Sequence, residues 1–161
     1  MPPRPMRKIF ISGEKGKGKF ALVDSEDHMQ LKQHSWSIHS KGYAQAVIDY
    51  QHIYMHRFVM NAQKGQQLDH INQNKLDNRK ENLRFADYAT NTMNRYKRRG
   101  KYSSIYKGVY KKPRNQGWAA QITHNKTMMY LGHYDTELEA AKVYNAKALE
   151  LHGEFACINQ L

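Results

Sequence analysis

The chain has 161 residues, and its 26 Lys and Arg against 14 Asp and Glu give a formal net charge of +12. This length holds one ordinary domain or two small ones. So basic a balance favours nucleic acid as the partner over an anionic membrane surface, and no apolar run of about 18 residues is present to span a bilayer. Cys157 is the single cysteine, which excludes an internal disulfide and a cysteine-rich zinc site and fits a reducing, cytoplasmic setting.

The residue pattern of the N-terminal third of the chain predicts strands and two short helices. Apolar or alternating runs predict strands within residues 20–23, 36–39 and 43–47. A short helix is expected over 27–33, with Ser25 as its N-cap, and the mixed apolar spacing of 52–60 favours a second helix. Residues 1–50 therefore form a β-rich segment that carries no motif with a chemical interpretation.

The next stretch predicts a hairpin followed by a helix. Residues 67–71 and 82–86 are two extended pieces on either side of a polar loop, 72–80. A helix is expected from Asp87, as N-cap, through Arg95. Together these elements span 66–96.

The C-terminal part predicts three antiparallel strands and one helix, after a basic linker at 98–103. The strands are expected within 108–111, 118–122 and 127–131, with turn residues between them. Thr136, followed three residues later by Glu139, resembles a capping box, and helical apolar spacing continues to Gly153. We therefore expect an α+β protein with one unit over 1–97 and another over 104–161.

Basic residues are concentrated around the linker. No acid occurs from Tyr88 to Tyr134, whereas ten Lys and Arg do. The densest group supplies the candidate DNA contacts Arg95, Lys97, Arg98 and Arg99. Such a surface binds phosphates with a strong dependence on salt.

An adjacent Asp69-His70 pair is the sharpest chemical signal. Hydrolysis of a phosphodiester needs an activated water and a cation on the developing charge. If the strand alternates its side chains, Asp69 can hold a metal while His70 deprotonates water, and Asn91 on the following helix can add an amide oxygen ligand. The alternative is that Asp69, Asn72 and Asn78 are turn residues that cap backbone groups.

The run Asp69-His70-Ile71-Asn72, then Asn78-Arg79 and Asn82-Leu83-Arg84, closely resembles the HNH endonuclease family. The resemblance is closest to the phage- and intron-encoded branch of this family, in which Asn replaces the last His. The spacing of His70, Asn82 and Asn91 matches the spacing in that branch. The resemblance implies a ββα-metal motif, in which Asp69 and Asn91 bind one Mg²⁺ or Mn²⁺. It also implies that His70 is the general base and that Asn82 braces the loop orienting it.

The pair His56-Arg57 also matches a His-Arg pair upstream of the motif in this branch. His56 is either a structural residue beside the hairpin or a phosphate contact. Arg57 and Arg84 are candidate phosphate clamps, with ordinary surface charge as the alternative for each.

Residues 104–159 resemble the Apetala-type domain of plant ethylene-response factors, through Tyr106-Lys107-Gly108-Val109, Gly117-Trp118-Ala119-Ala120 and Leu131-Gly132-x-Tyr134. In that family a three-stranded sheet, packed on a helix, lies in the DNA major groove. By position the candidate DNA contacts are Lys107, Tyr110, Lys112, Trp118, Gln121 and Tyr130. Trp118 and Tyr130 have a core position in the sheet as their alternative. Several expected Arg positions hold other residues here, so base specificity does not transfer.

The sequence as a whole predicts a metal-dependent endonuclease acting on double-stranded DNA, without a membrane or small-molecule cofactor. A bacterial or phage-infected cytoplasm is the expected location, and monomer and homodimer both stay open. The first alternative is a DNA-binding regulator on an HNH scaffold that no longer cuts. The second is a basic RNA-binding protein, which the regular pattern of elements and the lack of low-complexity tracts disfavour.

Overall fold

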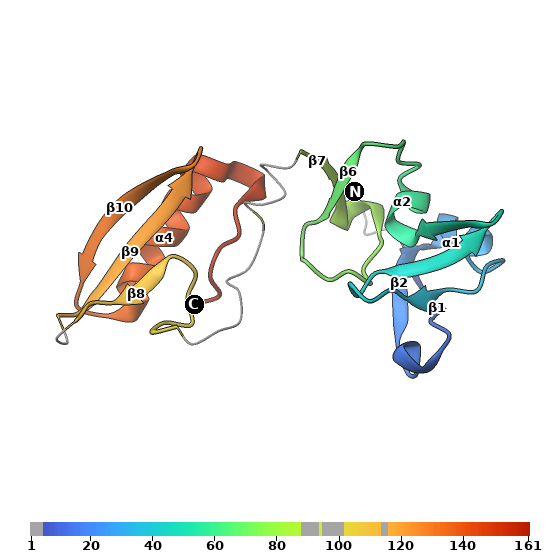
Figure 1. Cartoon of the computed structure of the whole chain (residues 1–161), viewed down its shortest axis with the longest axis horizontal. Helices are drawn as coiled ribbons and strands as arrows, with labels where there is room; N and C mark the ends of the chain where they lie inside the picture. The colour runs from blue at the N-terminus through green and yellow to red at the C-terminus, as the bar shows by residue number, and fades with distance from the viewer. Residues whose placement is uncertain (1–4, 88–93, 95–101, 114–115) are drawn as a thin grey trace. The chain divides into compact units, whose positions relative to one another are not determined.

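The computed structural model describes residues 5–87, 94, 102–113 and 116–161, and the chain divides into two compact units, Met1–Tyr88 and Ala89–Leu161 (Figure 1). Both units combine helix and sheet, so the expected α+β class is confirmed. The expected linker at 98–103 falls largely outside the described residues, so that boundary stays a prediction.

Three small antiparallel sheets form the first unit. Their strands are β1 (Met6–Phe10) with β2 (Phe20–Asp24), then β3 (Ser37–Ile38), β4 (Ala44–Ile48) and β5 (Gln51–Tyr54) in that order, and finally β6 (Gln67–His70) with β7 (Leu83–Ala86). The helical segments are η1 (Glu14–Gly16), α1 (Ser25–Leu31), α2 (Met55–Val59) and η2 (Lys80–Asn82). The β6–β7 hairpin lies where the polar-loop pattern predicts it.

Two expectations for the first unit need correction. The N-cap of α1 is Asp24, and Ser25 is the first helical residue; its hydroxyl donates instead to the carbonyl of Pro5 at 2.7 Å. The segment 52–60 is not one helix, because its first residues complete β5 and only then does α2 begin. Pairing with β4 decides this, since a strand partner outweighs weak helical spacing in a short segment.

A continuous apolar core holds the first unit together. It draws on β1, β2, both helices and the second sheet, and Trp36 is 1% exposed at its centre. The indole Nε1 of Trp36 donates to the carbonyl of Leu31 at 2.7 Å, which satisfies its buried polar atom. The core therefore supports the residues that hold the β6–β7 loop.

The second unit is a three-stranded sheet packed on one long helix. The strands β8 (Val109–Lys111), β9 (Trp118–His124) and β10 (Thr127–Tyr134) lie in the order β10-β9-β8, and α4 (Glu137–His152) is followed by η4 (Gly153–Phe155). The capping box of Thr136 and Glu139 is confirmed. Asn125 and Lys126 have φ values of 49° and 65°, which are typical of a two-residue hairpin turn. Because the turn is this short, β9 continues to His124, beyond its expected end at residue 122.

Small residues let α4 approach the sheet closely. Ala120, Ala140 and Ala141 are fully buried between them. At Gly108 (φ 75°) an added Cβ would lie 2.1 Å from Cδ2 of Tyr144, so only glycine fits. Within the described part of the chain, no helix is long and apolar enough to cross a membrane.

Candidate active site

The β6–β7 hairpin places Asp69 opposite Arg84 and His70 opposite Leu83. Asp69 and His70 are both buried, at 7% and 5% exposure. The guanidinium of Arg84 donates to Oδ2 of Asp69 from Nη2 at 2.8 Å and from Nε at 3.1 Å. Arg84 therefore holds the carboxylate of Asp69, which favours a positioning role over the phosphate clamp expected from the sequence.

His70 has surroundings that suit a proton acceptor. Its Nε2 lies 3.4 Å from Oδ1 of Asn78, which is itself completely buried. Burial lowers the pKa of His70 below its usual value, although Asn78 and the carboxylates of Asp69 and Asp77 act in the opposite direction. The imidazole is therefore neutral at neutral pH, the form that can accept a proton.

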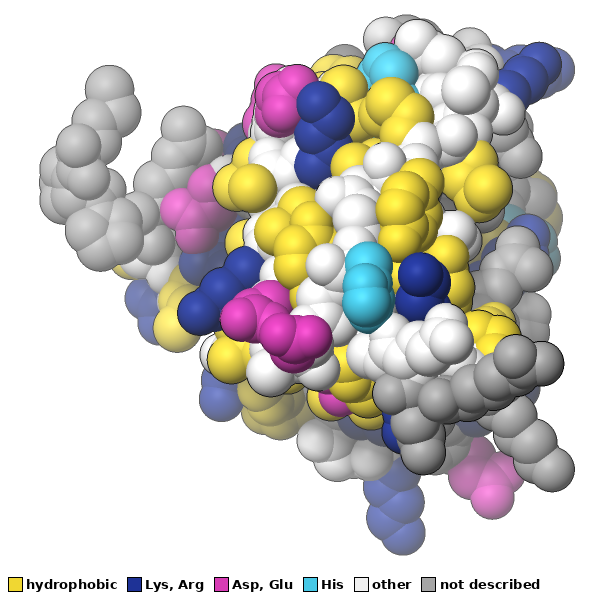
Figure 2. All heavy atoms as spheres, turned by 90° about the vertical axis from the view of Figure 1, so that its left-hand side faces the viewer, with side chains coloured by type: hydrophobic (Ala, Val, Ile, Leu, Met, Phe, Trp, Pro, Cys, Tyr) yellow, Lys and Arg dark blue, Asp and Glu magenta, His cyan; other side chains and the backbone are white. Residues whose placement is uncertain are grey.

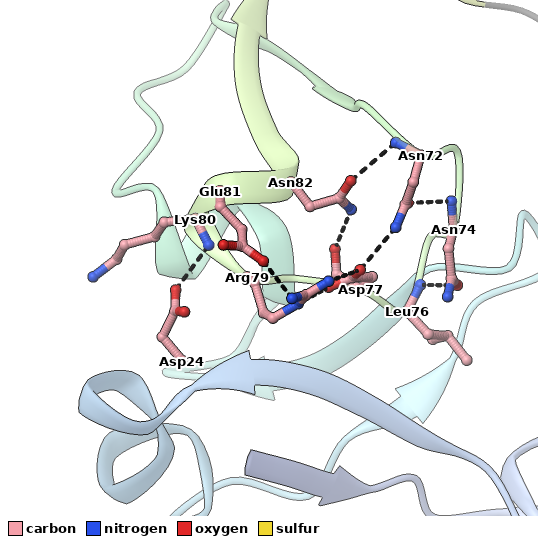
Figure 3. Close-up of polar contacts among 9 residues, drawn as sticks. All are labelled: Asp24, Asn72, Asn74, Leu76, Asp77, Arg79, Lys80, Glu81 and Asn82. Atoms are coloured by element: carbon pink, nitrogen blue, oxygen red, sulfur yellow. Dashed lines mark hydrogen bonds and ion pairs between the residues drawn. The ribbon is translucent and has the colours of Figure 1, made fainter. Parts of the chain in front are cut away.

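Asn82 joins the two ends of the loop between β6 and β7 (Figure 3). Its Oδ1 accepts from the backbone N–H of Asn72 at 2.9 Å, and its Nδ2 donates to the carbonyl of Asp77 at 2.8 Å. The backbone N–H of Ile71, next to His70, donates to the carbonyl of Asn82 at 2.9 Å. These bonds correspond to the brace that the family resemblance implies for Asn82.

Asp77 is the centre of the loop, a role that the sequence reasoning missed. Its Oδ1 accepts from Nε of Arg79 at 2.8 Å, and its Oδ2 accepts from Nη2 of Arg79 at 2.7 Å and from Nδ2 of Asn72 at 2.8 Å (Figure 3). Burial alone raises the pKa of Asp77, but the hydrogen bonds from Arg79 and Asn72 outweigh burial and lower it. The Asp-Asn-Arg run in the motif was the available signal.

The loop is also tied to the first sheet. The backbone N–H of Leu22 donates to the carbonyl of Leu76, and the N–H of Asn78 donates to the carbonyl of Leu22, both at 2.8 Å. The carboxylate of Asp24 accepts from the backbone N–H of Lys80 at 2.8 Å (Figure 3). The β-rich segment without a motif thus fixes the loop that carries Asn78.

Helix α2 brings His56 against His70. Their ring centroids lie 5.2 Å apart at 70°, and Tyr43 and Tyr54 flank His56 at 5.0 and 5.6 Å. Burial, then the charges of His70 and Arg57, lower the pKa of His56 to about 3. His56 is therefore neutral and packed beside the hairpin, which favours the structural alternative.

Arg57 points its guanidinium into the loop after α2. It donates to the carbonyls of Ala62 at 3.1 Å and of Gln63 and Gln66 at 2.7 Å. These three carbonyls occupy most of the N–H donors of Arg57. As for Arg84, a structural role is therefore favoured over phosphate binding; here the role is to hold the loop after α2.

In the second unit, the expected DNA contacts lie on both faces of the three-stranded sheet. Tyr110, Gln121 and Tyr130 alternate with residues that pack on α4, so they lie on the open face of the sheet, where Gln121 and Tyr130 pair directly. Figure 2, viewed from the left-hand side of Figure 1, shows hydrophobic side chains mixed with Lys, Arg and His and with some Asp and Glu. The rings of Tyr110 and Tyr130 on the open face are groups on which nucleic-acid bases can stack.

Lys107 and Trp118 differ from that expectation. Trp118 packs against the cluster of Val109 and Ala120, on the side that faces α4, as its core alternative stated. Lys107 borders a cavity of about 310 Å³ with Tyr144 and His152, and burial lowers its pKa. Lys112 follows β8, and its N–H donates to the carbonyl of Gly117 across the turn at 3.0 Å.

Several expected site residues cannot be placed. Asn91, Arg95, Lys97, Arg98 and Arg99 lie outside the described residues, as does most of the helix expected from Asp87. In the described part of the chain, no group of three or more His, Cys, Asp or Glu is arranged to hold a metal ion. The pairing of Asp69 with Asn91 therefore stays a prediction.

Comparison with known proteins identifies one clear relative. The chain is 32% identical over 153 residues to a protein of Acanthamoeba polyphaga mimivirus named as an uncharacterized HNH endonuclease. The match covers 91% of this chain and 78% of that protein. No protein-family model and no solved structure matches the chain.

Proposed function

The chain belongs to the HNH endonuclease family, and we propose that it hydrolyses phosphodiester bonds of double-stranded DNA with the help of a divalent metal ion. The observation that carries the proposal is His70, a neutral buried imidazole next to Asp69 on a hairpin whose loop is fixed by hydrogen bonds. A single active site of this kind nicks one strand, and double-strand cleavage needs two sites or two events.

Asp69 and Asn91 are the proposed ligands of one Mg²⁺ or Mn²⁺ ion. Carboxylate and amide oxygens are the donors that such hard cations prefer, so the chemistry of this pair fits. Arg84 holds the carboxylate of Asp69 through a buried ion pair. The ion, when bound, would neutralise charge that develops on the phosphate.

His70 is the proposed general base. The amide oxygen of Asn78 beside Nε2 selects the tautomer that is protonated there, and Nδ1 then accepts the proton of the attacking water. Asn82 and Asp77 hold the loop that carries Asn78 and so fix the imidazole ring. The products would carry 5′-phosphate and 3′-hydroxyl ends.

The second unit is proposed to supply DNA affinity. The open face with Tyr110, Gln121 and Tyr130 provides stacking and hydrogen-bonding groups, and the basic stretch from Arg95 to Lys126 provides phosphate contacts. Affinity should therefore fall steeply as salt rises.

A plasmid assay tests the proposal. Supercoiled DNA is incubated with the protein and Mg²⁺, Mn²⁺ or EDTA, beside His70→Ala and, as control, His52→Ala, which removes an exposed histidine of the same unit. We expect metal-dependent nicking or linearisation that falls at least ~100-fold in His70→Ala and is unchanged in His52→Ala. Salt-sensitive DNA binding without cleavage by the wild type would instead establish the binding-protein alternative.

A further inference from the structure

A positive group near the phosphate, in addition to the proposed metal ion, would assist cleavage by His70. Charge develops on the non-bridging oxygens as water attacks, and preorganised cations stabilise it. Arg84 is engaged with Asp69, and Arg57 with three backbone carbonyls. Another cation, Lys75, lies in the loop between β6 and β7, and the sequence reasoning gave it no role.

Three consecutive residues of the β3–β4 turn hold Lys75. Its Nζ donates to the carbonyl of Lys41 at 2.7 Å and lies 4.7 Å from the centre of the Tyr43 ring. Between them, Gly42 (φ 88°) presents bare backbone, and a Cβ there would lie 3.5 Å from Cδ of Lys75. A long flexible side chain is thus fixed at its stem and at its ammonium group.

The same contacts place Lys75 one aromatic ring away from the proposed general base. Its ammonium group lies 4.7 Å from the centre of the Tyr43 ring, and that ring lies 5.8 Å from the His70 ring. Lys75 is exposed, so a DNA backbone can reach it. An ammonium group has three N–H donors, of which the carbonyl of Lys41 takes one.

We propose that Lys75 is a catalytic residue of this site, whose ammonium group contacts a non-bridging oxygen of the phosphate that the water at His70 attacks. The turn Lys41–Tyr43 holds the ammonium group of Lys75 in that position. This inference rests on the proposed nuclease function, and it gives the N-terminal β-rich segment the role of positioning a catalytic side chain. The competing explanation is that Lys75 only fastens the loop to the turn.

Single-turnover cleavage separates these explanations. Lys75→Met keeps an apolar stem against Gly42 and Tyr43 but removes the charge, Lys75→Arg keeps the charge, and Lys64→Met removes an exposed charge from the same unit. We expect Lys75→Met to lower the rate about 100-fold, with DNA affinity within about threefold of wild type. Lys75→Arg should recover part of the rate, and Lys64→Met should cleave like the wild type. A wild-type rate in Lys75→Met, or a loss that only parallels lower thermal stability, would overturn the proposal.

Amine footprinting gives a test that does not depend on cleavage. His70→Ala is acetylated with and without a DNA duplex, and labelling of each lysine is measured by mass spectrometry. We expect DNA to protect Lys75 more strongly than Lys64, and equal labelling of Lys75 in both conditions would refute the contact. If the wild type never cleaves but Lys75 is protected, the nuclease function fails while the phosphate contact stands.

Discussion

Each unit of the molecule packs a pair of histidine rings against each other, and the two pairs differ in their surroundings. His56 and His70 meet at 5.2 Å and 70° in the first unit, and His124 and His152 stack at 5.4 Å and 26° in the second. His70 has the buried amide of Asn78 within reach. Among the described residues, neither nitrogen of His152 has a hydrogen-bond partner. Two close imidazoles therefore do not make a site; the polar groups around them decide whether chemistry is available.

The same contrast extends to the cores. The first unit buries a set of carboxylates and amides around its hairpin, namely Asp24, Asp69, Asp77, Asn78 and Asn82. The second unit buries mainly alanines and β-branched residues between sheet and helix. We therefore expect polar substitutions to affect the first unit most and steric substitutions to affect the second.

Asp77→Ala should produce the largest effect. It leaves Arg79 and Asn72 without their buried acceptor, so we expect the first unit to lose about 3 kcal/mol of unfolding free energy. Each unit contains one tryptophan, and urea unfolding in a Trp118→Phe background would follow Trp36 alone. Glu81→Ala, which removes the exposed partner of Arg79, should cost less than about 0.5 kcal/mol. Equal losses in the two variants would contradict the role given to Asp77.

Gly108→Ala should come next, and in the other unit. The new Cβ would collide with Tyr144 and also hold a positive φ, so we expect a loss of about 2–3 kcal/mol. Gly153→Ala shares the positive φ but meets nothing within 4 Å, so only backbone strain remains and the cost should be smaller, about 1–2 kcal/mol. Amide hydrogen exchange during thermal unfolding of the second unit measures the stability of both variants. A similar loss for Gly108→Ala and Gly153→Ala would contradict the role of close packing at Gly108.

Acid should destabilise both units. Burial lowers the folded-state pKa of His56 to about 3 and lowers that of His152, while an unfolded histidine has a pKa of about 6.5. The unfolded chain then binds protons first, so stability is complete above pH 6.5 and falls as pH drops through that value toward the folded pKa. We expect the first unit to lose about 1–2 kcal/mol between pH 7.5 and 5 in urea titrations. His56→Phe should flatten this dependence, and an unchanged slope would show that other groups cause it.

Removing the helix cap should have the smallest effect. Thr136→Ala deletes the acceptor for the backbone N–H of Glu139, which we expect to cost the second unit about 1 kcal/mol. Thr136→Ser keeps the hydroxyl and should restore most of it. Circular dichroism melts of the three proteins measure the difference, and a melt of Thr136→Ser as low as that of Thr136→Ala would exclude the cap as the cause.

The sequence predicted the helices and strands better than it predicted which groups each side chain contacts in the folded protein. Turn residues and alternation located the β6–β7 hairpin and the sheet of the second unit, because these patterns act locally. Trp118 and Lys107 were grouped with Tyr110 as candidate DNA contacts by their positions in the family resemblance, with a core position as the alternative for Trp118. The sequence did not show which face of that sheet α4 covers. Arg57 and Arg84 were candidate phosphate clamps, with ordinary surface charge as the alternative. A sequence shows a cation but not the carbonyls or the carboxylate that it contacts after folding.

The backbone bonds between Leu22 and the loop residues Leu76 and Asn78 limit how this catalytic motif can be moved between proteins. A fragment that began just before β6 would carry every residue of the motif and would still lack the strand that its loop pairs with. Recombination that transplants the activity must therefore transfer the first strands together with the motif. A search for relatives should look for both segments inherited as one block.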